Sequence, residues 1–416
     1  EVARCNGHDT EALEKALEQI RVAPRPGVVI ADTIKGRGVS FMEHESLPKD
    51  GMYAYHSGAP SAGDYERAIK ELLERTEALS DEATIEPPVP DIVPARPRVP
   101  VPSGASLVSL VEAYAESIVD LATQEKNLIA LDADLLLDTG LVPFKKRFPN
   151  RLLECGIAEQ DMVSMAGGLA LHGHLPVVHS FSCFLSRRPS EQIYNNATER
   201  SQIIYSGFLA GLIPAGPGHS HQAVSDISSL ASVPGLTMIQ PCSAVEVGLA
   251  LKYAASHEGS TYLRIFSPPH QEVVTPTDYA LTKGRGVVLS EGTDVVIFGY
   301  GPTMLNEAKK ATSLLSAETI SATIVNLPWL NVIDEDWVLG LATGHDLVVA
   351  LDDHYVVGGQ GDMIAGALGR NGSAPSVLQI GIESIPECGT TEEVMAFHRM
   401  DATSIASRVV AALRTG

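Results

Sequence analysis

The stretch Glu154-Cys155-Gly156-Ile157-Ala158-Glu159-Gln160, followed by the small-residue run Met162 to Leu171, decides how the rest of the chain is interpreted. A carboxylic acid, Glu159, lies where a glycine-containing loop passes into a segment of predicted helix. A lone glutamate at the start of a helix is stabilised by the helix dipole and needs no other role. The surrounding sequence must therefore decide between this structural role and a chemical one.

Outward from this stretch, short apolar runs alternate with segments of helical period. This alternation predicts an α/β fold with mostly parallel sheets flanked by helices on both faces. The expected strands cover 128–131, 177–178, 203–205, 295–298, 322–325 and 347–351, and the expected helices cover 160–171, 190–198, 244–255, 304–315 and 362–368.

The first part of the chain follows a similar pattern. Residues 9–21 have helical spacing and lead into the apolar run Val28 to Ala31, which predicts a buried strand, and a further helix is expected over 65–79. Prolines then recur at 87, 88, 90, 94, 97, 100 and 102, a composition that cannot form a helix or a central strand. We expect a proline-rich linker over 81–103.

Charge and cysteine content limit the class of protein. The formal charge of -21, from 30 basic and 51 acidic residues, repels phosphate backbones and anionic lipid, so neither nucleic acid nor a membrane is an expected partner. The 5 cysteines form no Cys-x-x-Cys pair, which favours a reducing, cytoplasmic location. No apolar run approaches the roughly 20 residues that cross a bilayer.

The motif Gly156-Ile157-Ala158-Glu159-Gln160 before an Ala/Gly-rich helix resembles the pyrimidine-binding domain of transketolases and of their deoxyxylulose-phosphate synthase relatives. In that family the glutamate hydrogen-bonds N1′ of the thiamine diphosphate pyrimidine. The C2 proton of thiamine is too weakly acidic to leave at neutral pH, so a carboxyl group drives the aminopyrimidine into its imino tautomer, which acts as an internal base. The resemblance implies that Glu159 is catalytic and that Ile157 binds the cofactor.

Three other patches agree with this resemblance. Phe181-x-x-Phe184 is similar to the aromatic pair that holds the aminopyrimidine, although two such residues are more often core. Asp134, in a turn after an expected strand, resembles the acidic position beside the thiazolium, although an acid there is commonly only solvated. His56 resembles a histidine near the diphosphate and the substrate, an assignment that depends wholly on the resemblance.

The loop Gly216-Pro217-Gly218-His219-Ser220-His221-Gln222 resembles the transketolase loop whose His-Gln pair faces the sugar, with His221 as the direct match. Two imidazoles beside a ketose can donate hydrogen bonds or carry protons near neutrality. A surface loop without a role is the simpler alternative for His221. No metal ligands are assigned, because the histidine pair lacks a third ligand at a suitable spacing.

The resemblance covers essentially the whole chain and implies a domain order. Residues 1–80 would close a diphosphate-binding domain, 104–275 would form the pyrimidine-binding domain, and 276–416 would form the transketolase C-terminal domain. The Gly-Asp-Gly…Asn motif that binds Mg²⁺ and the diphosphate is absent. We therefore expect the Mg²⁺ ligands on an N-terminal subunit or fragment, with the complete unit working as a homodimer or a heterotetramer.

Two arginines that grip phosphate in sugar-phosphate transketolases are also missing. Residues 103–109 contain no arginine, and Ser267 stands where the second is expected, while Arg264 is interpreted as an internal structural residue. Arg187, with its neighbour Arg188, is a candidate for a substitute anion contact. The sequence thus predicts transfer of a two-carbon ketol unit from a ketose to an aldehyde, with a non-standard sugar as substrate. The alternatives are a pyruvate-decarboxylating carboligase and a non-catalytic partner subunit.

Overall fold

The computed structural model describes residues 1–44, 53, 55–56, 60–83, 107–370, 372 and 375–415. The chain divides into two compact units, Glu1–Val99 and Pro100–Gly416. Apart from residues 81–83, which belong to a helix, the expected proline-rich linker lies outside the described residues.

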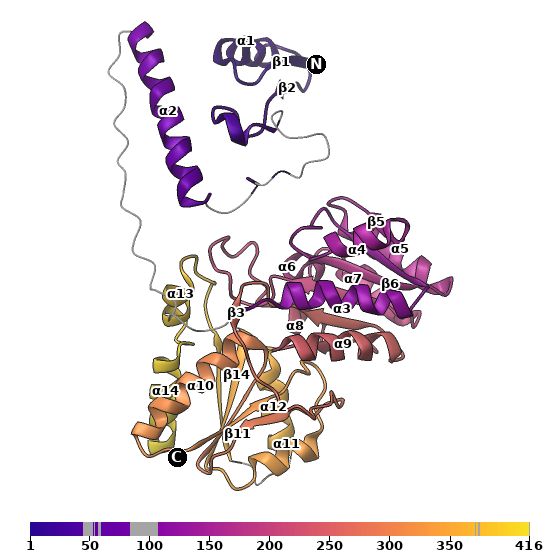
Figure 1. Cartoon of the computed structure of the whole chain (residues 1–416), viewed down its shortest axis with the longest axis vertical. Helices are drawn as coiled ribbons and strands as arrows, with labels where there is room; N and C mark the ends of the chain where they lie inside the picture. The colour runs from indigo at the N-terminus through magenta and orange to yellow at the C-terminus, as the bar shows by residue number, and fades with distance from the viewer. Residues whose placement is uncertain are drawn as a thin grey trace. The chain divides into compact units, whose positions relative to one another are not determined.

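The first unit begins with two parallel strands joined by a helix (Figure 1). Strand β1 (Val2–Asn6) pairs with β2 (Val28–Asp32), and α1 (Thr10–Arg21) lies between them in sequence. The expected strand at 28–31 is confirmed, but its expected burial is wrong, because Val28 is 57% exposed and Ile30 is 44% exposed. A sheet of two strands with one helix has too few neighbours to cover both of its faces.

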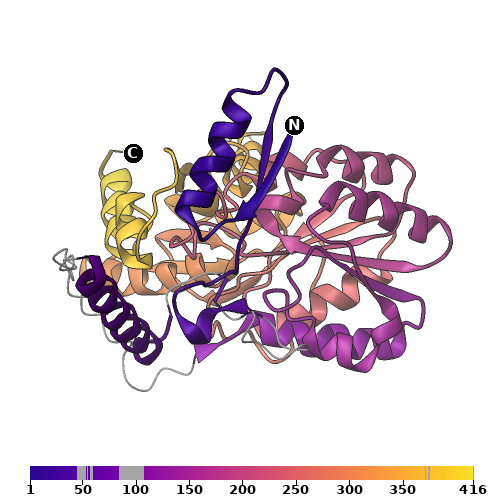
Figure 2. The same ribbon diagram turned by 90° about the horizontal axis from the view of Figure 1, so that it is seen from above.

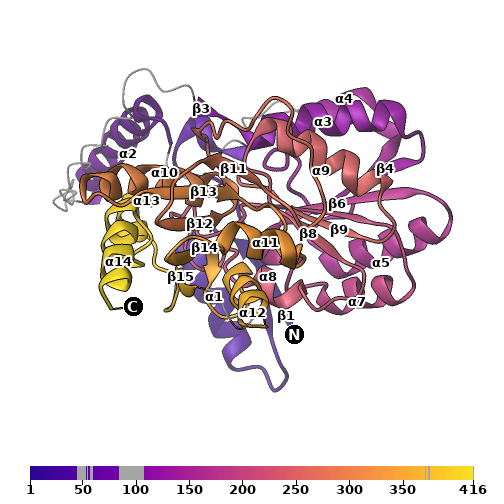
Figure 3. The same cartoon turned by 90° about the horizontal axis from the view of Figure 1, so that it is seen from below.

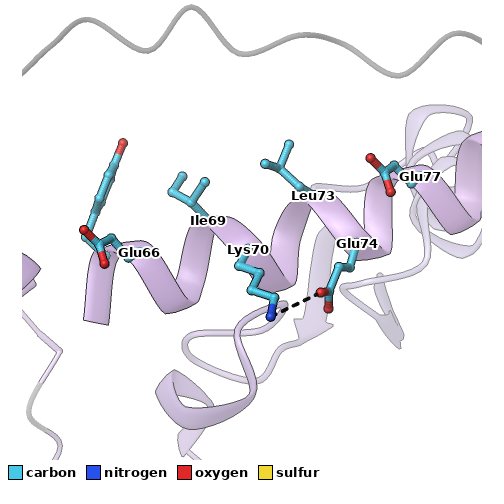
Figure 4. A pocket seen from close by; sticks show the side chains of 7 residues that line it. Glu66, Ile69, Lys70, Leu73, Glu74 and Glu77 are labelled. Atoms are coloured by element: carbon cyan, nitrogen blue, oxygen red, sulfur yellow. Dashed lines mark ion pairs between the residues drawn. The ribbon is translucent and has the colours of Figure 1, made fainter. Parts of the chain in front are cut away.

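The same unit ends in α2 (Ala62–Ala83), preceded by the short helix η1 (Ser40–Met42). Ile69 and Leu73 project from one face of α2, while Lys70 and Glu74 form an ion pair at 3.8 Å on another (Figure 4). Large apolar side chains are exposed along this helix, namely Tyr65, Leu72, Leu73 and Leu79. A helix of this kind usually buries its apolar stripe against another element.

The second unit contains a six-stranded parallel sheet of order β5-β4-β6-β7-β9-β8. The parallel arrangement and the strands β4, β6 and β7 agree with the alternating sequence pattern, which predicted neither the other three strands nor the strand order. Helices α3, α4 and α9 cover one face and α5 and α7 cover the other (Figure 3). The strands are β4 (Leu128–Asp132), β5 (Leu152–Glu154), β6 (Leu175–Phe181), β7 (Ile204–Phe208), β8 (Thr237–Ile239) and β9 (Thr261–Arg264), and the helices are α3 (Leu110–Gln124), α4 (Val142–Arg147), η3 (Pro149–Arg151), α5 (Glu159–Leu171), α6 (Ser182–Leu185), α7 (Ser190–Thr198), α8 (Asp226–Leu230) and α9 (Ala244–Ser256).

A second sheet of five strands has the order β11-β13-β12-β14-β15, in which only the β11–β13 pair is antiparallel. Helices α10 and α14 lie together on one face, and α11 and α12 on the other (Figure 3). The strands are β11 (Val287–Ser290), β12 (Val295–Gly299), β13 (Ala322–Asn326), β14 (Leu347–Tyr355) and β15 (Ser376–Ile382). The helices are α10 (Gly301–Ala317), α11 (Glu335–Ala342), α12 (Gln360–Arg370), α13 (Thr391–Phe397) and α14 (Ala402–Thr415). Outside both sheets, β3 (Leu107–Val108) and β10 (His270–Gln271) form an antiparallel ribbon of two strands.

Arg264, at the end of β9, connects the two sheets. Its fully buried guanidinium pairs with Asp226 at 2.9 Å and donates to the carbonyl oxygen of Asp353, at the end of β14, at 2.8 Å. These contacts confirm that Arg264 is an internal structural residue. Because a buried guanidinium must be fully paired, it fixes the carboxyl ends of strands from both sheets against each other.

Figure 2 shows the strands of the six-stranded sheet side by side from another direction. Among the helices of the described residues, none combines the length and the apolar character that crossing a bilayer requires.

Candidate active site

The candidate site residues of the second unit follow the carboxyl ends of four adjacent strands. Strands β5, β4, β6 and β7 are neighbours and parallel, so the loops that leave their carboxyl ends gather at one edge of the sheet. Asp134 follows β4, Glu159 follows β5, Phe181 ends β6, and the loop of His219 and His221 follows β7. This edge is the usual place for a ligand site in an open parallel sheet.

Glu159 is the first residue of α5, and only 4% of its surface is exposed. The preceding Ala158 offers no side-chain cap, and an acidic residue in the first turn is favoured by the positive end of the helix dipole. Its Oε1 accepts a hydrogen bond from Nη1 of Arg188 at 2.5 Å. A buried carboxylate needs such a partner, because an unpaired charge in the interior is strongly destabilising.

The aromatic pair is linked to this carboxylate through Arg188. The rings of Phe181 and Phe184 are 5.7 Å apart between centroids and tilted by 45°. The guanidinium carbon of Arg188 lies 3.8 Å from the centroid of the Phe184 ring. Arg188 therefore stacks on Phe184 while it is bonded to Glu159, a combination of cation–π and charge-assisted contacts that suits a planar guanidinium.

His221 belongs to the same group of side chains. Its ring centroid is 5.3 Å from that of Phe184 and 5.8 Å from that of Phe181. Burial, together with the positive charge of Arg188, lowers the pKa of His221 below its ordinary value. The imidazole is therefore mainly neutral at pH 7 and can either donate or accept a hydrogen bond. His219, in the same loop, is exposed.

Asp134 lies in a cluster of acidic residues at the ends of β4 and β5. Its backbone is in the left-handed region, with φ of 61°, and its N–H donates to Oε1 of Glu154 at 2.9 Å. Nearby Asp132 is fully buried, and this burial, reinforced by the charges of Glu154 and Asp134, raises its pKa to about 7 even though it accepts hydrogen bonds from Leu135 and Thr139. Sequence reasoning did not select Asp132. The Asp-x-Asp spacing at a strand end was the available signal.

The remaining candidates have other surroundings. Arg187 donates to Oγ of Ser225 at 2.9 Å, so of the two neighbouring arginines it is Arg188 that contacts Glu159. Ile157 is 73% exposed in the loop before α5. His56 is in the first unit, where its Nδ1 is 2.6 Å from Nζ of Lys35. Within the described residues, no group of three or more His, Cys, Asp or Glu side chains is arranged to hold a metal ion.

The effect of the Arg188 charge on the imidazole of His221 gives a first testable prediction. Replacing Arg188 with Gln removes a nearby positive charge, so the pKa of His221 should rise toward its ordinary value. An NMR titration of the histidine ring protons measures this pKa. The matched Arg187→Gln variant should leave the His221 pKa unchanged, and an equal rise in both variants would show that the Arg188 charge is not the cause.

Comparison with known proteins agrees with the fold. The profile described as "Transketolase, pyrimidine binding domain" matches residues 107–271, and "Transketolase, C-terminal domain" matches residues 284–405. A protein of Methanocaldococcus jannaschii, named as a transketolase C-terminal section, is 31% identical over 71% of this chain and 94% of its own length. The chain belongs to the transketolase family.

Other relatives show the range of this family. A 6-deoxy-6-sulfo-D-fructose transketolase subunit of Clostridium sp. strain MSTE9 is 29% identical over 68% of this chain and 88% of its own length. The 1-deoxy-D-xylulose-5-phosphate synthase of Aeromonas hydrophila is 28% identical over 96% of this chain, which spans only 58% of that relative. A solved structure described as a split gene transketolase, inactive beta4 tetramer, is 30% identical, with a TM-score of 0.67, over 74% of this chain and 99% of its own.

Proposed function

We propose that this chain supplies the pyrimidine-binding part of a thiamine-diphosphate site that transfers a two-carbon ketol unit from a ketose to an aldehyde. The observation that carries this proposal is the buried carboxylate of Glu159, which lies at a helix start within one side-chain group with Phe184 and His221. A glutamate with only a structural role in the helix dipole would not need to share a partner, Arg188, with an aromatic ring that itself packs on an imidazole.

The residues present fit the aminopyrimidine of thiamine diphosphate. Arg188 already places a flat, delocalised N–H donor on the face of Phe184 and against the carboxylate of Glu159. An aminopyrimidine offers the same features, namely a flat π surface and a ring nitrogen that pairs with a carboxyl group. Glu159 would hold N1′, and Phe181 and Phe184 would hold the ring, once the Arg188 side chain has moved away.

Each side chain has a separate task in this proposal. Thiamine diphosphate, when bound, supplies an acidic carbon, C2, that can add to the carbonyl group of the donor sugar. Glu159 exchanges a proton with N1′, and its buried position keeps water away from that proton. His221, together with His56 and His219, would hydrogen-bond the oxygens of the sugar. Asp134 would lie beside the thiazolium, and Ile157 would contact the cofactor.

The first unit and the relatives favour a partner polypeptide. The exposed faces of β1 and β2 and the exposed apolar side chains of α2 are surfaces that a neighbouring chain segment would cover. Two of the similar proteins are named as a section or a subunit of a transketolase. We propose that an N-terminal polypeptide supplies the Mg²⁺ ligands and the diphosphate site, and that complete units form a dimer or heterotetramer.

The substrate is proposed to be an unphosphorylated or otherwise modified sugar. Ser267 accepts a hydrogen bond from the N–H of Leu209 at 2.9 Å, and Arg264 is committed to Asp226 in the interior, so neither grips a phosphate. The similarity to the sulfofructose transketolase subunit is consistent with a sugar that carries a different group.

The missing arginines predict weak discrimination between acceptors. Each charge-assisted contact between an arginine and a phosphate contributes roughly 1.5 to 3 kcal/mol. Because both arginines are missing, the kcat/KM for ribose 5-phosphate should exceed that for ribose by much less than about 10³-fold. Steady-state kinetics with both sugars, in wild type and in Arg188→Gln, measure this ratio. A thousandfold preference that survives in Arg188→Gln would show that a phosphate site exists elsewhere.

A pyruvate-decarboxylating carboligase is a second candidate, favoured by the similarity to 1-deoxy-D-xylulose-5-phosphate synthase over nearly the whole chain. Release of carbon dioxide on mixing the complete enzyme with pyruvate separates the two reactions. A screen of ketose donors and aldehyde acceptors, with products identified by mass spectrometry, tests the proposed function. If no donor reacts although thiamine diphosphate binds, the chain is a non-catalytic subunit.

A further inference from the structure

A small pocket of about 270 Å³ lies in the part of the chain that follows the second sheet, away from Glu159. It is lined by Glu383, Ser384, Phe397, His398, Arg399 and Arg408. Glu383 and Ser384 directly follow β15, an edge strand of the second sheet. The pocket is therefore at the carboxyl end of a strand in an open, mostly parallel sheet, where ligands commonly bind.

The backbone at Arg399 is unusual for a residue with a long side chain. Helix α13 ends in a Schellman motif. In it, the N–H of Arg399 donates to the carbonyl of Ala396 at 3.0 Å, and the N–H of Met400 donates to the carbonyl of Met395 at 2.9 Å. This ending requires a left-handed residue, normally glycine, and Arg399 takes that place with φ of 56°. An arginine here costs some backbone energy, and this residue lines the pocket.

The second guanidinium of the pocket, that of Arg408 on α14, is held in place. It donates to the carbonyl oxygen of Gln379 at 3.1 Å and lies 3.6 Å from the carboxylate of Glu383, and its side chain is only 17% exposed. The Glu383 side chain, in contrast, is 69% exposed. The Glu383 carboxylate can therefore rotate into solvent, and another anion can then bind beside Arg408.

The pocket holds two guanidiniums and one carboxylate, that of Glu383. Arg399 and Arg408 both line the pocket. Burial lowers the pKa of Arg408, the carboxylate of Glu383 opposes this effect, and the positive charge of Arg399 adds to it. His398 accepts a hydrogen bond from the N–H of Glu387 at 3.2 Å, which requires a neutral imidazole nitrogen. With Glu383 turned outward, the pocket would present two positive charges in a chain whose net charge is -21.

We propose that this pocket binds the phosphate dianion of a small phosphorylated metabolite. Guanidinium groups match phosphate oxygens geometrically and bind them through charge-assisted hydrogen bonds. The ring of Phe397, which is 58% exposed, is available to cover the uncharged part of such a molecule. The proposal does not depend on the reaction proposed for Glu159.

An occupant of the pocket would act on a segment that also contacts the candidate active site. Glu387 donates its N–H to His398, and its carbonyl accepts a hydrogen bond from Nε2 of Gln222, next to His221, at 3.0 Å. Cys388 donates to the carbonyl oxygen of Gly216 in the same histidine loop at 3.2 Å. The segment from Glu383 to Cys388 thus connects the pocket with the loop that carries His221.

Isothermal titration calorimetry with inorganic phosphate tests the proposal on the chain as purified, with thiamine diphosphate and Mg²⁺ present so that a diphosphate site is filled. The decisive variant is Arg399→Gly, because glycine suits the left-handed backbone. It should keep or raise the melting temperature and weaken phosphate binding at least about tenfold, the value expected for one lost charge-assisted contact.

Arg200→Gly is the matched control. Arg200 follows α7 in the same Schellman motif, with φ of 58°. The substitution therefore removes the same charge from the same kind of helix end. This variant should bind phosphate like the wild type. Equal affinities of the Arg399→Gly and Arg200→Gly variants, a loss of binding only in Arg188→Gln, or no binding of millimolar phosphate by the wild type would each overturn the proposal.

Discussion

The Glu159→Gln variant should fold normally and lose almost all activity. An amide has nearly the same shape as the carboxyl group but cannot exchange a proton with the ring nitrogen of a bound pyrimidine. The expected loss in kcat is on the order of 10³-fold or more, which corresponds to at least about 4 kcal/mol of barrier. Initial rates of the complete enzyme, with saturating thiamine diphosphate and Mg²⁺, measure this loss.

Glu191→Gln is the control that separates chemistry from helix stabilisation. Glu191 is also an acidic residue in the first turn of a helix, α7, and it is exposed. If Glu159 only stabilised α5 through the helix dipole, both substitutions would cost about 1 kcal/mol of stability or less and leave the rate unchanged. We expect that small effect for Glu191→Gln alone.

Activity should depend completely on the proposed N-terminal partner. Thiamine diphosphate must be held at both ends, and Mg²⁺ requires oxygen ligands that orient the diphosphate. We expect the chain alone to show no turnover, and addition of the partner to restore activity up to a fixed molar ratio. Native mass spectrometry of the purified material identifies the partner, and activity titration gives the ratio.

The same preparation can contradict the partner proposal. If the 416-residue chain alone is monodisperse, binds thiamine diphosphate with Mg²⁺ and turns over, no partner is needed. In the complete assembly, the partner should also protect β1 and β2 from amide hydrogen exchange, because their exposed faces and edges would then be covered. If amide hydrogen exchange in these strands stayed the same in the complete assembly, the partner would bind to another surface.

The sequence predicted part of the second unit, and elements such as α3, α14 and β15 were not among those expected. Strand runs such as 128–131 and helical periods such as 190–198 are long and regular, and the structure forms β4 and α7 at these places. Burial of β2 was not predictable from its apolar residues, because burial depends on neighbouring strands as well as on the strand itself. Val28 and Ile30 are apolar but exposed for this reason.

The sequence predicted site residues where a motif fixed their positions. It could not decide which of two neighbouring residues of the same type reaches the site. Glu159 and the aromatic pair came from such motifs, and the structure places them in one side-chain group. The choice between Arg187 and Arg188 depended on the direction of each side chain after α6, which spacing alone does not determine. The raised pKa of Asp132 likewise depends on how deeply the end of β4 is buried.

Exchange of the C2 hydrogen of bound thiamine diphosphate for deuterium tests the role of Glu159 most directly, because it reports proton transfer before any sugar takes part. The measurement uses rapid quenching of the complete enzyme in deuterium oxide, followed by NMR of the released cofactor. Exchange should be fast in the wild type and in Glu191→Gln and at least about 10³-fold slower in Glu159→Gln. Wild-type exchange in Glu159→Gln would contradict the account, since Glu159 would then have no part in activating the cofactor.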